Sequence, residues 1–121
     1  MRLKFETTKL LHDMGMPANL RGYEYLREAV MQCVREPDTV RGITTRLYPR
    51  VAAVFDTTPS RAERAMRNAI ETAFSRGDIE KLRDVFGYTI HPDKGRPTVS
   101  EFVALTADAL RLRMEAEKWR S

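Results

Sequence analysis

The sequence has little of what builds cross-linked or metal-bound frameworks. Its 121 residues include one cysteine, Cys33, and two histidines, His12 and His91. A single cysteine excludes an internal disulfide and favours a reducing setting. The two histidines stand far apart, with no cysteine or acidic cluster at ligand spacing beside them, so no metal site is expected.

Long apolar runs are also missing. No segment approaches the roughly 20 apolar residues that cross a bilayer, and the N-terminal MRLKFETTK lacks the apolar centre of a secretory signal. We therefore expect a soluble, cytoplasmic protein without membrane contact. The six glycines are scattered, so no phosphate-binding loop is predicted. No group of residues suggests an acid, a base or a nucleophile, and we expect neither catalytic residues nor a cofactor.

Positive charge is what the chain has in excess. It carries 21 lysines and arginines against 17 aspartates and glutamates, a formal net charge of +4. The guanidinium fork of arginine suits phosphate groups and guanine edges. A net positive charge is compatible with a polyanionic partner but does not establish one. The length predicts one domain over residues 1–121.

Helical periodicity dominates the sequence, and strand-like alternation is nearly absent. Helices are predicted over residues 5–14, 21–35, 49–55, 59–75 and 79–86, with a helical segment over 38–47. A capping box at Thr98 and Glu101 begins a last helix, which fades into a charged tail from residue 113. The irregular stretch 88–97 is predicted to form a turn or a small hairpin.

Residues 51–77, VAAVFDTTPSRAERAMRNAIETAFSRG, have the layout of a helix-turn-helix. A short apolar helix is followed by a polar turn in which Thr58 is a plausible N-cap and Pro59 a first helical residue. A long helix with several arginines comes next. This layout places a helix in the DNA major groove.

A helical wheel divides the long helix into two sides. The apolar side consists of Ala62, Ala65, Met66, Ala69, Ile70 and Ala73. The polar side consists of Ser60, Arg61, Arg64, Arg67, Asn68 and Glu71. Within the first three turns, Arg61, Arg64 and Asn68 are neighbours, where such helices reach base edges. Arginine can donate two bonds to guanine, worth about 1–3 kcal/mol of discrimination, and Glu63 can accept from cytosine. Ser60 and the helix N-terminus suit a phosphate.

Other interpretations stay open at this point. A face rich in arginine and glutamate is often only a solvated surface, and Glu63 and Arg67 at i, i+4 support the helix by themselves. The basic helix also fits an all-α interaction module that binds an acidic protein partner. Lys94 and Arg96 either clamp the DNA backbone or belong to a mobile charged loop. Tyr25 is a candidate for stacking on bases.

The segment TTPSRAERAMRNAIETAFSRG (57–77) is similar to the recognition region of a known family. This is the C-terminal DNA-binding effector domain of the stage 0 sporulation protein A family of response regulators. Further blocks agree in order and spacing: MGMPANLRGYEYLREAV (14–30), ITTRLYPRVAAVFDTTPSR (43–61), FGYTI (86–90) and GRPTVSEFVALTADALRLR (95–113). The resemblance covers about residues 10–113 and leaves 114–121 as a charged tail.

The resemblance implies an all-α domain of about six helices that contains a helix-turn-helix, like the winged-helix-like effectors of response regulators. It implies a transcription factor domain, activator or repressor, that binds TGTCGAA-like boxes in double-stranded DNA. Head-to-tail homodimers on tandem boxes and contact with the sigma subunit of RNA polymerase are implied as well. Family members carry an N-terminal receiver domain, for which 121 residues leave no room, so no aspartate here is expected to be phosphorylated.

The resemblance also assigns roles to residues. Glu63 and Arg64 correspond to the base-reading pair. Arg61 corresponds to a further position of the recognition helix, where we expect a base contact or a phosphate contact. Arg67 corresponds to a phosphate or base contact. Residue chemistry, and not the resemblance, adds Ser60, Asn68, Lys94 and Arg96 as expected backbone contacts. The sigma-contacting surface corresponds to 77–90 and includes Asp78, Lys81, Phe86 and Ile90. Two features depart from the family pattern: Asn68 stands where histidine is expected, and Lys81, Arg83 and Asp84 make the sigma segment more charged.

Overall fold

The computed structural model describes residues 2–76 and 96–120, and all regular structure in these stretches is helical. The elements are α1 (Arg2–Asp13), α2 (Arg21–Arg35), η1 (Pro37–Gly42), η2 (Ile43–Leu47), α3 (Tyr48–Val54), α4 (Pro59–Arg76) and α6 (Val99–Arg120). The predicted all-α class is confirmed. The helix predicted over 79–86 lies outside the described residues, as does most of the turn or hairpin predicted over 88–97.

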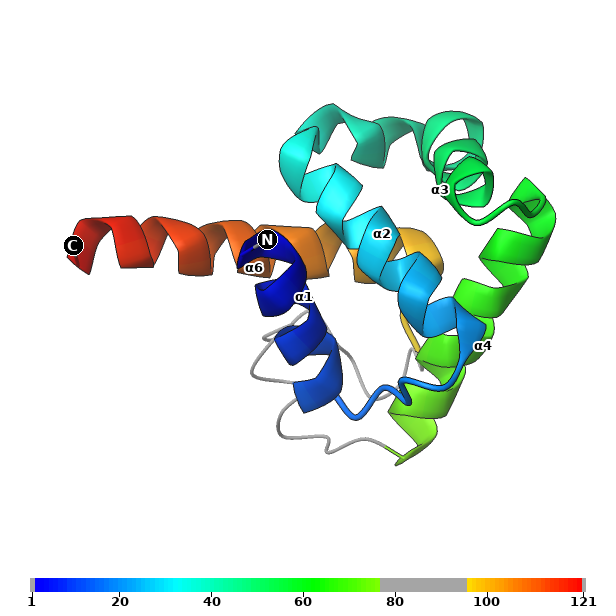
Figure 1. The fold of residues 1–121 in the computed structure, drawn as a ribbon, viewed down its shortest axis with the longest axis horizontal. Helices are drawn as coiled ribbons and strands as arrows, with labels where there is room; N and C mark the ends of the chain where they lie inside the picture. Colours follow the sequence, from blue (N-terminus) through cyan, green and yellow to red (C-terminus); the bar gives the residue numbers. More distant parts are fainter. Residues whose placement is uncertain (1, 77–95, 121) are drawn as a thin grey trace.

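Helix α2 runs through the centre of the fold and packs against α1, α4 and α6 (Figure 1). The apolar residues at helical spacing along α2 include Tyr23, Leu26, Val30 and Cys33, which are buried, and Val34, which is partly buried against the same core. Tyr25 is buried as well, and its ring centroid lies 4.7 Å from that of Phe55 at the end of α3. The expectation that Tyr25 stacks on bases is therefore wrong, because the ring is used to join α2 to the helix-turn-helix.

The contact between α2 and α4 depends on a glycine. A Cβ atom built on Gly22 would lie 2.0 Å from the carbonyl oxygen of Ala65 and 2.8 Å from the Cβ of Ala69. Real Cβ atoms do not approach backbone atoms this closely, so only glycine fits at the start of α2. Together with the buried alanines of α4, Gly22 lets the two helices approach at the level of their backbones.

The predicted helix-turn-helix is present in α3, α4 and the turn between them. The amide of Thr57 donates to the carbonyl of Ala52 at 2.9 Å, which folds the chain back at the end of α3. Asp56 has a φ of 53°, a left-handed conformation that aspartate tolerates better than most residues. Thr58 then caps α4, since its Oγ1 accepts from the amide of Arg61 at 3.2 Å.

The segment before α3 differs from the prediction of one helical segment over 38–47. It consists of a 3-10 turn, η1, and a short π-helical turn, η2. Gly42, at the junction, has φ −123° and ψ 45°, values outside the helical region that interrupt the hydrogen-bond pattern. Ile43 and Leu47 are nevertheless buried, as the apolar pattern requires. Helix α3 begins at Tyr48, one residue before the predicted start.

Both ends of the described chain are more helical than predicted. Helix α1 begins at Arg2 rather than at residue 5, and α6 continues to Arg120 instead of fading after residue 113. Arg2 and Glu117 form an ion pair that joins the two ends. In Figure 1 the C-terminal part of α6 extends beyond the body of the molecule. Neither α6 nor any other helix of the described residues is long and apolar enough to cross a membrane.

The start and the middle of α6 are fixed by hydrogen bonds. The predicted capping box is present: Thr98 Oγ1 accepts from the amide of Glu101, and the Glu101 carboxylate accepts from the amide of Thr98, both at 3.1 Å. Further along, Arg111 donates to the carbonyl of Cys33 at 3.0 Å, in the last turn of α2, where a positive charge is favoured. The buried Cys33 thiol has its pKa raised to about 11 by desolvation, which the charge of Arg111 partly offsets.

Candidate nucleic-acid interface

Helix α4 lies along one edge of the molecule (Figure 1), with one side packed and the other in solvent. The packed residues are at most 1% exposed: Ala62, Met66, Ala69, Ile70 and Ala73. The side chains predicted to face outward are all exposed: Ser60, Arg61, Arg64, Arg67, Asn68 and Glu71. The division of the helix into two sides, as predicted from the wheel, is therefore confirmed.

Three of these residues, Arg61, Arg64 and Asn68, form a ridge that we call the outward row. Their spacing of three and four residues places them one above another on the helix surface. The row spans about 10 Å along the axis, which corresponds to roughly three base-pair steps. Within the described residues, the guanidinium groups of Arg61 and Arg64 have no ion pair or hydrogen-bond partner, so their donors are available to a ligand.

The start of α4 suits an anion. Thr58 Oγ1 accepts the Arg61 amide, the Thr58 carbonyl accepts the Ala62 amide, and Pro59 has no N–H. In the first turn of α4 this leaves the Ser60 amide without a helical partner. Ser60 is exposed in this turn. The positive end of the helix dipole and a free hydroxyl are the combination that binds phosphate oxygens in many proteins.

Glu63 is placed differently from its neighbour Arg64. Its side chain is 29% exposed, and its Oε1 lies 3.8 Å from Nε of Arg67, whose side chain is 56% exposed. The pair stands beside Tyr48 of α3. Desolvation raises the pKa of the Tyr48 hydroxyl, the charge of Glu63 raises it further, and that of Arg67 lowers it. Glu63 therefore lies on the flank of α4 that faces α3, while Arg64 belongs to the solvent-facing ridge.

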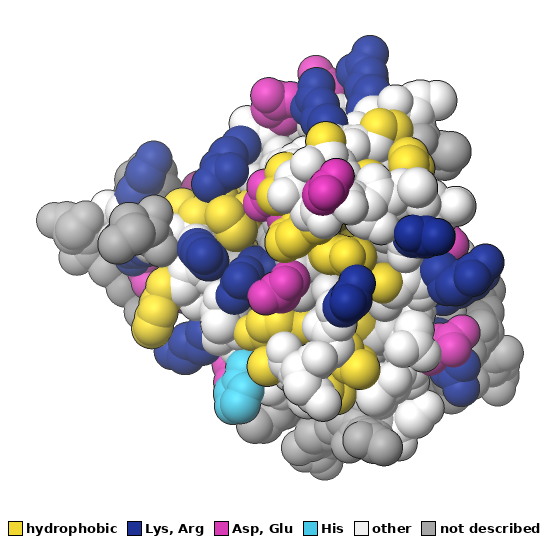
Figure 2. Space-filling view, turned by 45° about the vertical axis from the view of Figure 1, so that its right-hand side comes forward, with side chains coloured by type: hydrophobic (Ala, Val, Ile, Leu, Met, Phe, Trp, Pro, Cys, Tyr) yellow, Lys and Arg dark blue, Asp and Glu magenta, His cyan; other side chains and the backbone are white. Residues whose placement is uncertain are grey.

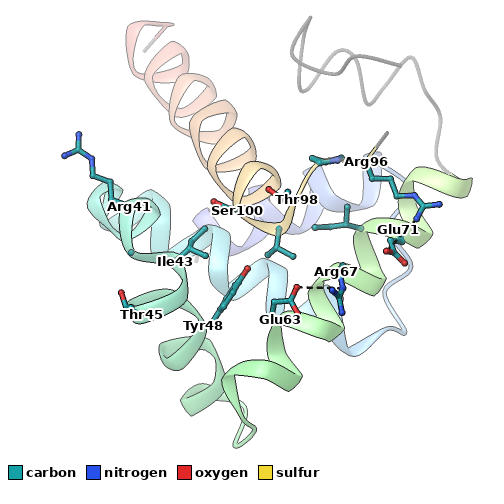
Figure 3. Close-up of a pocket in the computed structure, with 14 residues that line it drawn as sticks. Arg41, Ile43, Thr45, Tyr48, Glu63, Arg67, Glu71, Arg96, Thr98 and Ser100 are labelled. Atoms are coloured by element: carbon teal, nitrogen blue, oxygen red, sulfur yellow. Dashed lines mark ion pairs between the residues drawn. The ribbon is translucent and has the colours of Figure 1, made fainter. Parts of the chain in front are cut away.

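This flank borders a hollow of about 670 Å³, shown in Figure 3. We call it the flanking hollow. Its walls come from η1, η2, the start of α3, one side of α4 and the start of α6. The charged and hydroxyl-bearing residues that line it are Arg41, Thr45, Tyr48, Glu63, Arg67, Glu71, Arg96, Thr98 and Ser100. Three separate segments of the chain therefore meet beside the outward row.

Arg96 comes from the segment that leads into α6, and the structure brings it to α4. Its Nη1 lies 3.7 Å from Oε1 of Glu71. The predicted backbone contacts Arg67 and Arg96 thus border the same hollow. Lys94 lies outside the described residues, as do Asp78, Lys81, Phe86 and Ile90 of the expected sigma-contacting surface.

Sequence reasoning missed Arg41. It lies in η1, is exposed, and stands at the rim of the flanking hollow opposite α4 (Figure 3). No motif marks this arginine, because its proximity to α4 comes from the turn that η1 and η2 make before α3. In the sequence, only its place just before Gly42 in an irregular segment sets it apart.

The charge on the face that carries α4 is mixed. In Figure 2, basic side chains occur at several places on this face, with acidic and apolar side chains between them. A surface of this kind does not attract DNA as a uniform basic sheet would. The surface offers individual arginines at defined positions and not a continuous positive patch.

The chain was also compared with models of protein families. Residues 7–110 match the family described as sporulation initiation factor Spo0A C terminal, a match that includes the whole of α2, α3 and α4. The chain belongs to this family. The Spo0A C-terminal domain is a DNA-binding effector domain of a response regulator that controls transcription in sporulation, and its family is not one of enzymes.

Membership of the Spo0A C-terminal family agrees with the geometry of α3 and α4. It favours DNA binding over the alternative that the basic helix binds an acidic protein. Among residues 2–76 and 96–120, no group of three or more histidine, cysteine, aspartate or glutamate side chains is arranged to hold a metal ion. The chemistry available at this surface is therefore that of guanidinium, hydroxyl, amide and carboxylate groups.

Proposed function

We propose that this domain binds double-stranded DNA sequence-specifically by laying α4 in the major groove. The observation that carries the proposal is the outward row. Arg61, Arg64 and Asn68 project from the first three turns of a helix whose opposite side is fully buried. A helix with its side chains, 10–12 Å across, fits a major groove about 12 Å wide.

Within this proposal the residues have distinct roles. Arg64 donates two hydrogen bonds to the O6 and N7 atoms of a guanine, and Arg61 makes a further base contact. Glu63 accepts from a cytosine amino group. Its pairing with Arg67 leaves it free to do so, because the two groups are 3.8 Å apart and such partly exposed pairs contribute only about 0–1 kcal/mol.

The remaining groups hold the DNA backbone. Ser60 binds one phosphate through its hydroxyl and its amide at the start of α4. Arg67 and Asn68 on α4, and Arg96 before α6, bind others, and Lys94, two residues before Arg96 in the sequence, is proposed to add one more. These contacts set the position of α4 in the groove and carry no sequence information of their own.

The family gives the proposal its target and partners. We propose that the domain reads TGTCGAA-like boxes, that two copies bind tandem boxes head to tail, and that residues 77–90 contact the sigma subunit of RNA polymerase. Family membership alone supports these three points. A cytoplasmic location follows from the same proposal.

The decisive experiment measures binding to a duplex with two tandem TGTCGAA boxes and to a scrambled duplex, by fluorescence anisotropy. The intact chain should prefer the box duplex. Arg64→Ala should weaken box binding by about 1–3 kcal/mol and leave binding to the scrambled duplex almost unchanged. Arg113→Ala is the matched control, because it removes the same charge from the exposed part of α6 and should not change the preference.

Two results would contradict the proposal. If the intact chain binds both duplexes equally, the domain does not read this box. If Arg64→Ala weakens binding to both duplexes by the same factor, Arg64 is a phosphate contact and not a base reader. In a separate experiment, site selection from random duplexes with Glu63→Ala shows which base pair depends on Glu63.

A further inference from the structure

The rim of the flanking hollow carries an arginine that the proposed function does not yet use. Arg41 is exposed, and in Figure 3 its side chain extends outward from η1. Within the described residues its guanidinium has neither an ion pair nor a hydrogen-bond partner. An exposed guanidinium without a partner is available to an anion from outside.

The place of Arg41 follows from the order of the elements. Helix η2 ends at Leu47 and α3 begins at Tyr48, so η1 and η2 form the approach to the first helix of the helix-turn-helix. In such motifs the first helix crosses the DNA backbone while the second enters the groove. The approach to α3 therefore lies where the phosphates that border the groove would pass.

The hollow itself lies on the side of α4 that carries Arg67 and Glu71. Because α4 with its side chains nearly fills a major groove, the phosphates on either border must lie over the elements beside α4. On this side those elements are η1, η2 and the segment before α6. The sugar–phosphate backbone of a DNA strand along this border of the major groove passes Arg67 and reaches the rim of the hollow at Arg41.

The charges of the hollow favour an anion at the rim more than at its floor. Arg67 and Arg96 each have a carboxylate nearby, at 3.8 Å and 3.7 Å, so their charges are partly balanced. The N-terminus of α6 is occupied too, since the capping box places the Glu101 carboxylate on it. Of the three arginines around the hollow, Arg41 alone has an unbalanced charge among the described residues.

We propose that Arg41 is a phosphate contact and that the rim of the flanking hollow seats the DNA backbone beside α4. The inference rests on the proposed function, because the phosphate is that of the duplex read by the outward row. This phosphate contact comes from η1, whereas the contacts proposed above come from α4 and from the segment before α6. It also divides the arginines into groups with separate effects: Arg61 and Arg64 determine sequence preference, and Arg41 contributes to the affinity for any duplex.

The test compares Arg41→Ala with the unchanged chain over a range of salt concentrations, on the box duplex and on the scrambled duplex. Losing one phosphate contact should reduce the slope of log K against log salt by about 0.9. Between 50 and 200 mM salt, the loss of affinity should become smaller by a factor of about 3.5. The ratio of box to scrambled affinity should stay the same, and Arg41→Lys should keep most of the slope.

Arg113→Ala again serves as the control for net charge, and circular dichroism confirms that each variant is folded. An unchanged slope in Arg41→Ala, or a slope change equal to that of Arg113→Ala, would overturn the inference. A changed ratio between the duplexes would overturn it as well, because it would make Arg41 a base reader. Failure of the proposed function is distinguishable, since in that case the unchanged chain itself does not prefer the box duplex.

Discussion

Replacing Gly22 by alanine tests the close contact between α2 and α4. The new Cβ would lie 2.0 Å from the carbonyl oxygen of Ala65, 2.6 Å from its carbonyl carbon and 2.8 Å from the Cβ of Ala69. Two of these atoms belong to the backbone of a helix and cannot rotate away. The helices must therefore separate by more than 1 Å, which opens the packing around the buried Met66 and Leu26.

The magnitude follows from two opposing terms. Overpacking of a core contact costs about 1–3 kcal/mol, and a clash with backbone belongs at the upper end of this range. Alanine gains at most about 1 kcal/mol over glycine in helix propensity, and less in the first turn. We expect Gly22→Ala to lower the free energy of unfolding by about 2 kcal/mol. Urea unfolding followed by circular dichroism measures this change as a shift of the midpoint.

Gly42→Ala is the matched control. Its Cβ would meet the Cδ of Arg46 at 3.0 Å, the flexible end of an exposed side chain that can move aside. It should therefore change stability by less than about 0.5 kcal/mol. If Gly22→Ala unfolds at the same urea concentration as the unchanged chain, or if the two variants lose the same stability, α2 and α4 do not meet as the structure shows.

Two further predictions concern stability. Thr58→Ala removes the acceptor for the Arg61 amide at the start of α4 and should cost about 1 kcal/mol, whereas Thr58→Asp should keep most of the stability; equal urea midpoints for all three proteins would exclude the cap. The pKa of Cys33 is about 11 in the folded state and 9.0 ordinarily, so the thiol ionises first in the unfolded state. The free energy of unfolding should therefore fall as pH rises from 9 to 11, by at most about 2–3 kcal/mol. Urea unfolding at several pH values measures this fall against Cys33→Ala as the reference, and parallel pH curves for the two proteins would refute the shift.

Local periodicity predicted much of the fold correctly. The bounds of α2 and the two sides of α4 follow from apolar residues at helical spacing, because one-sided burial is written into a short stretch of chain. Thr58 and the pair Thr98 and Glu101 were recognisable as caps for the same reason, since a cap and its amide are three residues apart. The resemblance also identified the family to which the chain belongs.

What the sequence did not reveal depends on contacts between distant segments. The helical wheel places Glu63 at the edge of the apolar side, but its proximity to Tyr48 arises only because α3 folds back against that flank of α4. Arg41 reaches the hollow through the irregular turn at Gly42, and α6 continues as a helix where its end pairs with Arg2. None of these arrangements can be read from spacing within one helix, since each needs the three-dimensional path of the chain.

The backbone contact at Gly22 means that the residues that hold α4 in place differ from the exposed residues proposed to contact DNA. The tilt of α4 against the body is fixed by main-chain atoms and methyl groups, and the side chains of the outward row take no part in it. Substitutions at Arg61, Arg64 and Asn68 therefore leave the mounting unchanged. Under the proposed function, exchanging the solvent-facing Arg61 and Arg64 changes the binding preference without rebuilding the interior.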